Sequence, residues 1–400
     1  MSKRSTFLEL RLLTLAVLAT SGLSFATNIL LANSMGPDVF GQYAYVLVLG
    51  ALFGELVFFG STEAGMRLES RYGERALDWI LTTRILNFCL VAMGAVIAFF
   101  VSHEMTVLFA LVVTLNSLSF ATQYEAQGRN VRYASVYLVE RILITVFIWI
   151  GLLSLDSGLM VWVFGTMAVF QGASLLFQYM ENQTVKICIF WRGLFNVYKV
   201  GLFVLVFSMS KFSFGGVTRI LIFNQLGEEQ MGVFAAAWQF VPLSTLYFAQ
   251  TTKTWRLQIT RALKEGDTDG FLKNLKALTL VVMVPSLLAA ILFWLFGDRI
   301  IGLLLSSAYW DASFLMPFIG AYFLVVGFDS ILLLLAIASS KAMLAGVIYV
   351  LFGGLTILAC LLGALGHALE GYLLTVVLGH SCAAGVLGLA LFCSIRRSLG

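Results

Sequence analysis

Two cations stand in an otherwise apolar stretch of the sequence. Lys211 and Arg219 lie within residues 199–225, a run long enough to cross a bilayer. A charged side chain at mid-bilayer costs about 2.5–3.5 kcal/mol or more, so both should face protein or water. In a regular helix, these positions lie about 12 Å apart along the axis and about 80° apart around it. Such a pair suits an anionic group such as a phosphate, which Arg grips with two parallel hydrogen bonds.

Other roles remain open for these two cations. Either could form a structural ion pair inside the protein, and Arg219 could extend its head group toward the outer membrane surface. Arg84 and Arg141 lie nearer the predicted cytoplasmic side of their spans. They are further candidates for binding an anionic head group, or else basic residues that fix the orientation of the chain.

Glu55 and Asp329 are the deepest acidic residues of the predicted spans. A carboxylate in such a position could take up a coupling proton or ion, and ionisable residues inside a membrane usually mark functional sites. It could equally serve as the counter-ion of Lys211 or Arg141. Both interpretations place these acids among the candidate site residues.

Neutral polar side chains form a third set of candidates. Asn116, Ser119 and Gln123 recur at positions i, i+3 and i+7, which would place them on one face of a helix. Asn28 and Gln239 are the corresponding candidates in two other spans. Their amides could hydrogen-bond the hydroxyl groups of a sugar. More simply, small and polar residues allow helices to pack closely in a membrane.

Residues for other kinds of chemistry are missing from the sequence. The five cysteines contain no C-x-x-C pair and the three histidines are far apart, so we expect no disulfide framework and no metal site. No G-x-x-x-x-G-K-[ST] motif is present, and no cofactor is expected. A polysaccharide polymerase or ligase would need a large outer loop with catalytic residues. The longest predicted outer loop, 297–313, is short, so we expect no enzymatic activity.

Composition indicates which elements position these residues. Of the 400 residues, 60% are hydrophobic and 12% are charged, with a mean hydropathy of +0.94. Soluble domains contain about 45–50% apolar and about 25% charged residues. One globule cannot bury so much apolar surface, so the chain must lie in a lipid bilayer. We predict an all-α polytopic membrane protein.

Twelve apolar runs are long enough to span a membrane. They cover residues 9–34, 39–64, 78–101, 106–126, 133–153, 158–180, 199–225, 230–254, 274–296, 314–338, 342–363 and 369–394. With a cytoplasmic N-terminus, the basic residues follow the positive-inside rule. Of the 25 Lys and Arg residues, 22 lie in the cytoplasmic segments and their flanks, Arg299 falls in an outer loop, and Lys211 and Arg219 lie inside a predicted span. We therefore predict that both termini are cytoplasmic.

A short turn occurs twice in the sequence. NSMGPDVFGQYA at 33–44 aligns without a gap with NQLGEEQMGVFA at 224–235. Each copy falls between the first and second spans of a set of six, although similar turn chemistry alone could produce such a match. Because six is even, two such sets would be parallel repeats around a central cleft. We predict an N-terminal lobe at 1–182, a cytoplasmic linker at 183–198 and a C-terminal lobe at 199–400.

At these turns the chain resembles a known family. MGPDVFGQY, 35–43, is similar to the LGPEEYGxY-like turns of the polysaccharide-transport branch of the multidrug/oligosaccharidyl-lipid/polysaccharide (MOP) exporter superfamily. This branch contains the Wzx-type flippases of O-antigen and other bacterial surface polysaccharides. FFGSTEAGMRLESR, 58–71, resembles the end of the family's second helix, and RILIFNQLGEEQMGVFAAAWQF, 219–240, resembles its seventh and eighth helices. The resemblance spans the whole chain in layout.

The resemblance implies two six-helix lobes in a MATE/MOP-like V and transport by alternating access. The cargo would be a polyprenyl-pyrophosphate-linked oligosaccharide, moved from the cytoplasmic to the outer leaflet of the bacterial inner membrane for O-antigen, capsule or exopolysaccharide synthesis. Expected partners are this lipid-linked oligosaccharide and membrane lipids, with the polysaccharide polymerase machinery as a further candidate. No nucleic-acid partner is expected. Twelve spans fit this branch better than the lipid-II flippases, which usually have fourteen.

Two other transporter classes share this layout. A MATE-like drug or cation exporter has the same fold, but we expect its cleft to favour acids and aromatics, whereas here two cations lie within a span. A major-facilitator transporter also has twelve spans in parallel halves. Its basic motif after the second helix is only partly matched by GSTEAGMR, 60–67. We therefore expect a flippase for an anionic cargo, with these two classes as alternatives.

Overall fold

The computed structural model is helical throughout its regular structure. It describes residues 3–61, 68–69, 72–73, 75–155, 158–182, 186–339, 341–363, 366 and 368–399. Within these ranges, ten helical segments are long and apolar enough to cross a membrane. The predicted all-α polytopic class is confirmed. The resemblance carried by residues 58–71 falls largely outside the described residues.

The chain divides into two compact units. Unit 1 contains Met1–Ser34 and Gln42–Met209, and unit 2 contains Met35–Gly41 and Ser210–Gly400. The long helix α1, Lys3–Phe58, therefore belongs to unit 1 except for its central turn, which packs with unit 2.

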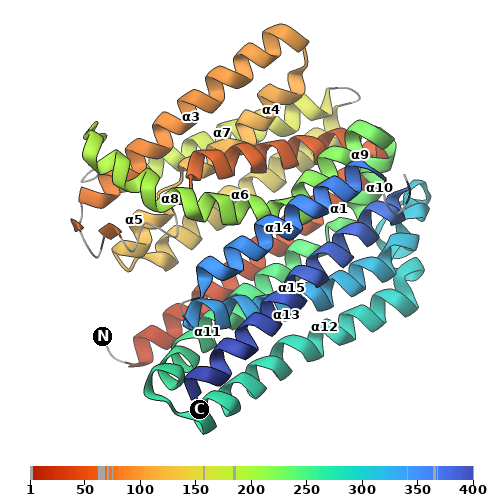
Figure 1. Ribbon diagram of the computed structural model, residues 1–400. Coiled ribbons are helices and arrows are strands. Elements are labelled where there is room, and N and C mark those ends of the chain that lie inside the picture. Colours follow the sequence, from red (N-terminus) through yellow and green to blue (C-terminus); the bar gives the residue numbers. More distant parts are fainter. Residues whose placement is uncertain are drawn as a thin grey trace. The chain divides into compact units, whose positions relative to one another are not determined.

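Unit 1 is built from pairs of neighbouring helices. After α1 these are α3 (Arg75–Ser102), α4 (Met105–Thr114), the 3-10 helix η1 (Leu115–Leu118), α5 (Ala121–Ala126), α6 (Asn130–Ser154), α7 (Leu159–Glu181) and most of α8 (Trp191–Phe212). Helix α3 packs on α4, and α7 packs on both α4 and α6 (Figure 1). Outward-facing Leu, Val and Phe side chains on these helices suit a lipid surround.

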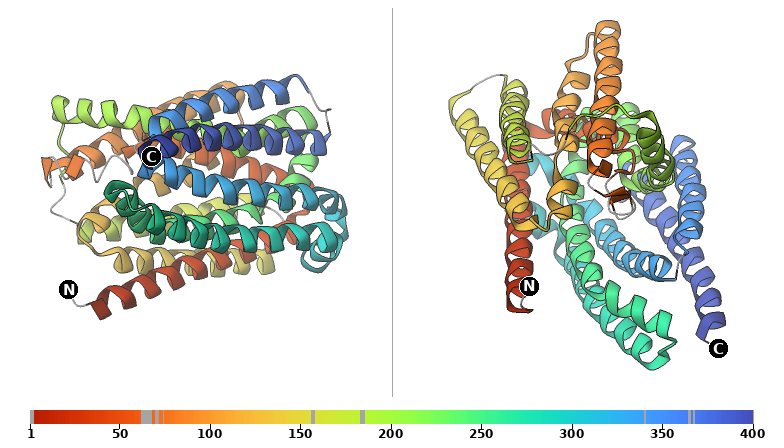
Figure 2. Two further views of the ribbon diagram at one scale, coloured as in Figure 1. Left: turned by 60° about the horizontal axis from the view of Figure 1, so that its bottom comes forward. Right: turned by 90° about the vertical axis from the view of Figure 1, so that its left-hand side faces the viewer.

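Unit 2 is arranged around one central helix, α13. Its elements after α8 are the π-helix η2 (Ser213–Val217), α9 (Thr218–Leu226), α10 (Glu228–Trp238), α11 (Val241–Glu265), α12 (Thr268–Leu304), the 3-10 helix η3 (Ser307–Leu315), α13 (Met316–Ala338), α14 (Ala342–Leu361) and α15 (Leu369–Leu399). Helix α13 packs against α11, α12, α14 and α15. Figure 2 shows α12, α13 and α15 running side by side. Polar side chains on α13 are therefore shielded from lipid.

The ten candidate spans of the described residues can be compared with the twelve predicted crossings. The segment Leu15–Phe58 has 44 residues, about 66 Å of helix against a hydrocarbon core of about 30 Å. A break at Gly36 divides it into two spans. Helix α10 has only 11 residues and α11 carries a charged end, so neither is among the ten long apolar segments. Together they cover the predicted span 230–254.

Both copies of the repeated turn have the same backbone conformation. Gly36 has φ 73° and ψ 169°, and Gly227 has φ 91° and ψ 179°. This region is accessible essentially only to glycine, so the residue type is required at both positions. Pro37 and Glu228 then begin the following helices, as expected for residues that suit a helix N-terminus.

The two turns also pack against each other within unit 2. A Cβ atom on Gly41 would meet the carbonyl oxygen of Glu228 and come within 2.9 Å of the Gly232 nitrogen. A Cβ atom on Gly232 would in turn meet the carbonyl oxygen of Pro37 and come within 3.0 Å of its Cα. Glycine is therefore needed in each copy because the backbone of the other copy occupies the space.

Candidate functional site

The candidate site of unit 2 forms around a distortion in one membrane helix. Lys211 ends α8 and Arg219 begins α9, and the π-helical turn Ser213–Val217 separates them. A π-turn amounts to one extra residue in a helix, so the two cations differ by about 20° around the axis rather than about 80°. The assumption of a regular helix was wrong here. The two side chains point toward nearly the same side.

Asp329 is the acidic centre of the site. It lies midway along α13 with 2% of its surface exposed. Its Oδ2 atom is 3.2 Å from Lys211 Nζ, and both groups belong to unit 2. The Lys211 side chain keeps 35% of its surface exposed while the acid keeps 3%. The geometry is that of a lysine at the edge of a cavity or surface, anchored by a buried counter-ion.

His380 is a second neighbour of Asp329, and the sequence analysis did not single it out. Its Nε2 atom is 3.4 Å from Asp329 Oδ2, and its Nδ1 atom is 3.3 Å from the hydroxyl of Tyr322. The imidazole stacks on Phe214 with ring centroids 4.6 Å apart. A histidine inside a long apolar run, as in α15, is the signal that could have drawn attention to it.

Aromatic rings line the side of the site that carries the cations. Lys211 Nζ lies 5.5 Å from the ring centre of Tyr349, and Arg219 Cζ lies 5.8 Å from that of Trp238. Both distances allow attraction between a cation and a π face. Trp238 also packs on Tyr322, with centroids 5.0 Å apart. A continuous set of contacts therefore runs from Arg219 through the aromatic rings to His380 and Asp329.

Arg219 uses little of its hydrogen-bonding capacity on the protein. Its Nε atom donates to the carbonyl oxygen of Gly215, at 2.9 Å, inside the π-helical turn. Among the residues that the structure describes, its two terminal nitrogens have no hydrogen-bond acceptor. A guanidinium presents those nitrogens as a planar fork that matches a phosphate or carboxylate. Arg219 therefore has the donors that an anionic ligand needs.

Gln239 follows Trp238 at the break between α10 and α11. Its side chain is buried, and both Nε2 and Oε1 lack hydrogen-bond partners among the described residues. An unpaired buried amide is costly, by about 1–3 kcal/mol for each group. Its neighbour in the sequence, Trp238, belongs to the aromatic set. The amide is suitably placed to bind a polar ligand or water.

The predicted polar face in the fourth span does not form on one helix. Asn116 lies in the 3-10 helix η1, Ser119 follows its end with an extended ψ of 148°, and Gln123 lies in the next helix, α5. The i, i+3, i+7 spacing assumed an unbroken helix and is wrong there. Gln123 is fully buried, and its amide atoms have no hydrogen-bond partner within the described part of the chain.

Arg84 explains the break in that span. Its Nη1 atom donates to the freed carbonyl oxygen of Ser119, at 2.8 Å. Nε donates to Ser61 Oγ at 2.9 Å, and Nη2 donates to Thr122 Oγ1 at 3.0 Å. The side chain is 1% exposed, and its guanidinium lies over the Phe58 ring. All three nitrogens are thus engaged by unit 1, which is a structural arrangement.

Arg141 belongs to a separate polar group of unit 1. It follows the start of α6 by 11 residues, about 16 Å of helix, which places it near the middle of this helix. Its Nη2 atom donates to the Tyr137 hydroxyl at 2.7 Å, whereas its buried Nε has no partner among the described residues. Asn28 accepts from the Tyr43 hydroxyl at 3.3 Å in the same unit.

The candidate residues therefore separate into two units. Lys211, Arg219, Asp329 and Gln239 lie in unit 2, and the remaining predicted residues, Glu55 included, lie in unit 1. Glu55 is half-buried in α1. Within the described ranges, no three His, Cys, Asp or Glu side chains come together as a metal site.

Comparisons with known proteins identify the fold. No family model and no curated protein sequence matches the chain. An inward-facing multidrug resistance MATE family transporter of the MOP superfamily is similar with a TM-score of 0.72 and 15% identity, over 95% of each chain. The chain has the fold of these proteins over nearly its whole length.

Two further solved structures show the same similarity. A mutant of the Vibrio cholerae MATE transporter VcmN has a TM-score of 0.64 and 14% identity, over 99% of each chain. A MOP superfamily transporter from Pyrococcus furiosus has a TM-score of 0.63 and 14% identity, over 98% of this chain and 97% of its own. The Pyrococcus protein is described as having a binding pocket of reverse polarity that suggests a different function.

Proposed function

We propose that this protein is a flippase that moves a polyprenyl-pyrophosphate-linked oligosaccharide across the bacterial inner membrane. The cargo would travel from the cytoplasmic to the outer leaflet for surface polysaccharide synthesis. The MATE-like fold supports transport, and the family resemblance of the repeated turn supports this branch of transporters. The observation that carries the choice of cargo is the excess of positive charge inside unit 2.

That excess follows from the partners of the two cations. Lys211 pairs with a buried acid, Asp329, at 3.2 Å, whereas Arg219 has no acidic partner among the described residues. The charges of Lys211 and Asp329 cancel, and the positive charge of Arg219 is left over. An uncompensated charge inside a membrane protein is expensive unless a ligand or water faces it. A pyrophosphate would supply the missing negative charge.

Individual residues would have distinct roles in holding such a cargo. Arg219 would grip a phosphate oxygen pair through its two terminal nitrogens, which have no acceptor among the described residues. Lys211 would add a second positive charge while remaining anchored to Asp329. The amide of Gln239 and the face of Trp238 would contact the sugar. Arg84 is left out of this binding role because the protein already occupies its three nitrogens.

The remaining parts of the proposal concern orientation and partners. We place both termini in the cytoplasm. The two halves, 1–182 and 199–400, would move so that the site is exposed to each side of the membrane in turn. Arg141 and Asn28 would contact the cargo from the first half, with Glu55 as a coupling group. Membrane lipids and a polysaccharide polymerase would be its partners.

A MATE-like exporter of drugs or cations is the second candidate function. Its support is the similarity to solved multidrug transporters and the free oxygen of Asp329, whose Oδ1 has no hydrogen bond among the described residues. A cation bound to Asp329 would compete with Lys211 and His380 for the carboxylate. The reverse pocket polarity described for the Pyrococcus transporter favours the anionic cargo, because it suggests that pocket charge separates functions within this superfamily.

The test is a gene deletion followed by analysis of lipid-linked sugars in inverted and right-side-out membrane vesicles. We expect the lipid-linked oligosaccharide to accumulate on the cytoplasmic face, and the wild-type gene to relieve the accumulation. Arg219→Gln should fail to relieve it, whereas Arg299→Gln, at an exposed arginine, should succeed. Absence of any accumulated intermediate, combined with a new sensitivity to cationic drugs, would favour the exporter.

A further inference from the structure

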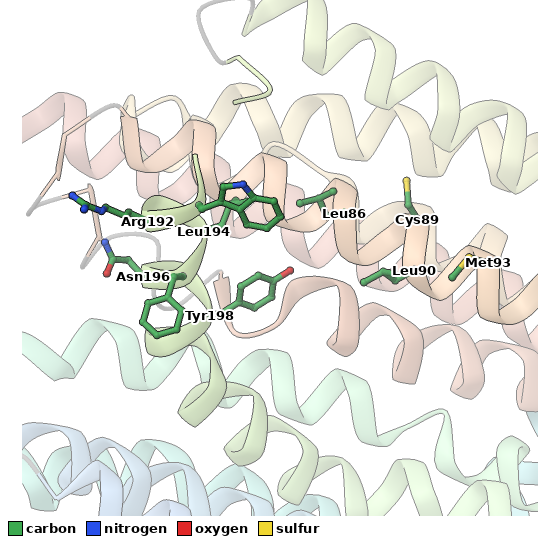
Figure 3. Close-up of a pocket in the computed structure, with 10 residues that line it drawn as sticks. Leu86, Cys89, Leu90, Met93, Arg192, Leu194, Asn196 and Tyr198 are labelled. Carbon is green, nitrogen blue, oxygen red and sulfur yellow. The ribbon is translucent and has the colours of Figure 1, made fainter. Parts of the chain in front are cut away.

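A groove with one polar and one apolar end lies in unit 1, whereas the cation site belongs to unit 2. It has a volume of about 930 Å³ and is formed by one face of α3 and the first turns of α8 (Figure 3). On α3 it is lined by a single helical stripe with the spacing i, i+3, i+4, i+7, namely Leu86, Cys89, Leu90 and Met93. This volume lies within the range of sites that hold ligands of drug size.

Contacts between the two helices determine which end of the groove is polar. Gly193 packs so closely on the Trp79 ring that a Cβ atom would overlap it, and the Tyr198 hydroxyl donates to Asn87 Oδ1 at 2.7 Å. The α3 stripe therefore continues beyond Tyr198, while Arg192 lies at the opposite end. Figure 3 shows Arg192 and Asn196 at one end of the groove, and the sulfur of Met93 at the other.

The length of the helical segment indicates the depth of the polar end. Helices α8 and α9 with η2 contain 36 residues, Trp191–Leu226, or about 54 Å of helix against a hydrocarbon core of about 30 Å. With the orientation predicted from the sequence, we place the first turns of α8 at the depth of the cytoplasmic lipid head groups. Trp191 and Arg192 are both exposed there, and this pair of residue types is typical of a membrane interface.

Charge and polarity together indicate what the groove accepts. Its cationic end carries Arg192, which we place at head-group depth. Its other end offers only aliphatic and sulfur-containing side chains toward the bilayer centre. We propose that this groove binds an anionic phospholipid of the cytoplasmic leaflet, with its phosphate on Arg192 and an acyl chain along the α3 stripe. The site is independent of the transported cargo.

The test measures which lipids the full-length protein retains. The protein is reconstituted into vesicles of equal parts phosphatidylcholine and phosphatidylglycerol, extracted in mild detergent, and its bound lipids are identified by native mass spectrometry. We expect phosphatidylglycerol to be retained about fivefold over phosphatidylcholine, the preference that one cation near an anionic surface produces. Arg192→Gln should bring the ratio close to one, and Leu90→Trp should reduce the bound lipid by filling the apolar end.

Matched controls keep the result interpretable. Arg256→Gln removes an exposed arginine elsewhere, and Leu355→Trp enlarges an exposed leucine of unit 2; neither should change the retained lipid. All four substitutions are at exposed side chains, so folding should be preserved. An unchanged lipid ratio in Arg192→Gln would overturn the proposal. Displacement of phosphatidylglycerol by an equal amount of added polyprenyl phosphate would also overturn it, because the groove would then belong to an isoprenoid carrier.

Discussion

Arg84 in unit 1 and Arg219 in unit 2 are both arginines within apolar spans, yet their surroundings differ. Arg84 donates from all three nitrogens to Ser61, Ser119 and Thr122 and is 1% exposed. Arg219 has one hydrogen bond to the described part of the chain, to the Gly215 carbonyl one turn earlier, and its guanidinium lies over the ring of Trp238. The first arginine completes the structure of its unit, whereas the second keeps its donors available.

The difference shows how a buried cation can be assigned to structure or to binding. A buried donor without an acceptor costs free energy, so a side chain that exists for structure has its donors satisfied by protein. Donors left unsatisfied in a folded protein indicate a place for a ligand or water. Lys211 is an intermediate case, because Asp329 anchors it while a third of its side chain remains exposed.

The strongest test of this comparison is Arg84→Gln. This substitution removes charge-assisted hydrogen bonds to the Ser119 carbonyl and to two hydroxyl groups, all of which are buried. We expect a loss of about 3–5 kcal/mol in the free energy of unfolding, seen as a lower melting temperature in detergent and poor accumulation in the membrane. A melting temperature equal to that of the wild type would show that Arg84 is not structural.

Removal of the buried acid should have the next largest effect. Asp329→Ala leaves Lys211 and His380 without their shared carboxylate and should cost about 3 kcal/mol in stability. The paired replacement Lys211→Met with Asp329→Leu should restore the melting temperature, since an apolar pair often replaces a buried ion pair at little cost. The double variant should nevertheless fail to transport the cargo. If the double variant transported the cargo, the Lys211–Asp329 pair would have no part in the transport mechanism.

Arg219→Gln tests the second arginine of this comparison. Because few protein groups depend on this guanidinium, its loss should change the free energy of unfolding by less than about 1 kcal/mol. Transport of the anionic cargo should fall tenfold or more, as expected when charge-assisted hydrogen bonds to a ligand are lost. A melting temperature lowered as far as that of Arg84→Gln, with transport intact, would contradict the distinction between the two arginines.

The smallest expected effect concerns His380. In His380→Phe the stacking on Phe214 is preserved and only the ring nitrogens are lost, so stability should change by less than about 1 kcal/mol. His380→Ala loses the stacking as well and should be less stable than the Phe variant by about 1 kcal/mol. Melting temperatures of the two variants measured in parallel check this order. Equal values would show that the ring packing contributes nothing.

Much of the fold was predictable, because hydrophobic run length and the positive-inside rule constrain membrane helices directly. The pairing of Lys211 with Asp329 was one of the alternatives that residue depth suggested, and the structure has it. The π-turn Ser213–Val217 and the break at Ser119 were not predictable from side-chain spacing. Both arise where the backbone gives up regular hydrogen bonds and neighbouring groups, such as Arg84, satisfy the freed carbonyls.

The sequence by itself determined the solvent, the all-helical class and the identity of the buried charges. These depend on the transfer free energies of individual residues, which are local properties. It also marked the repeated turn NSMGPDVFGQYA, whose glycine must adopt a conformation closed to other residues. Only the tertiary structure decided that the two turns pack on each other, that Asp329 holds Lys211 beside His380, and that the described residues satisfy all three nitrogens of Arg84 but only Nε of Arg219. Those outcomes depend on distances between residues far apart in the chain, which local free energies do not specify.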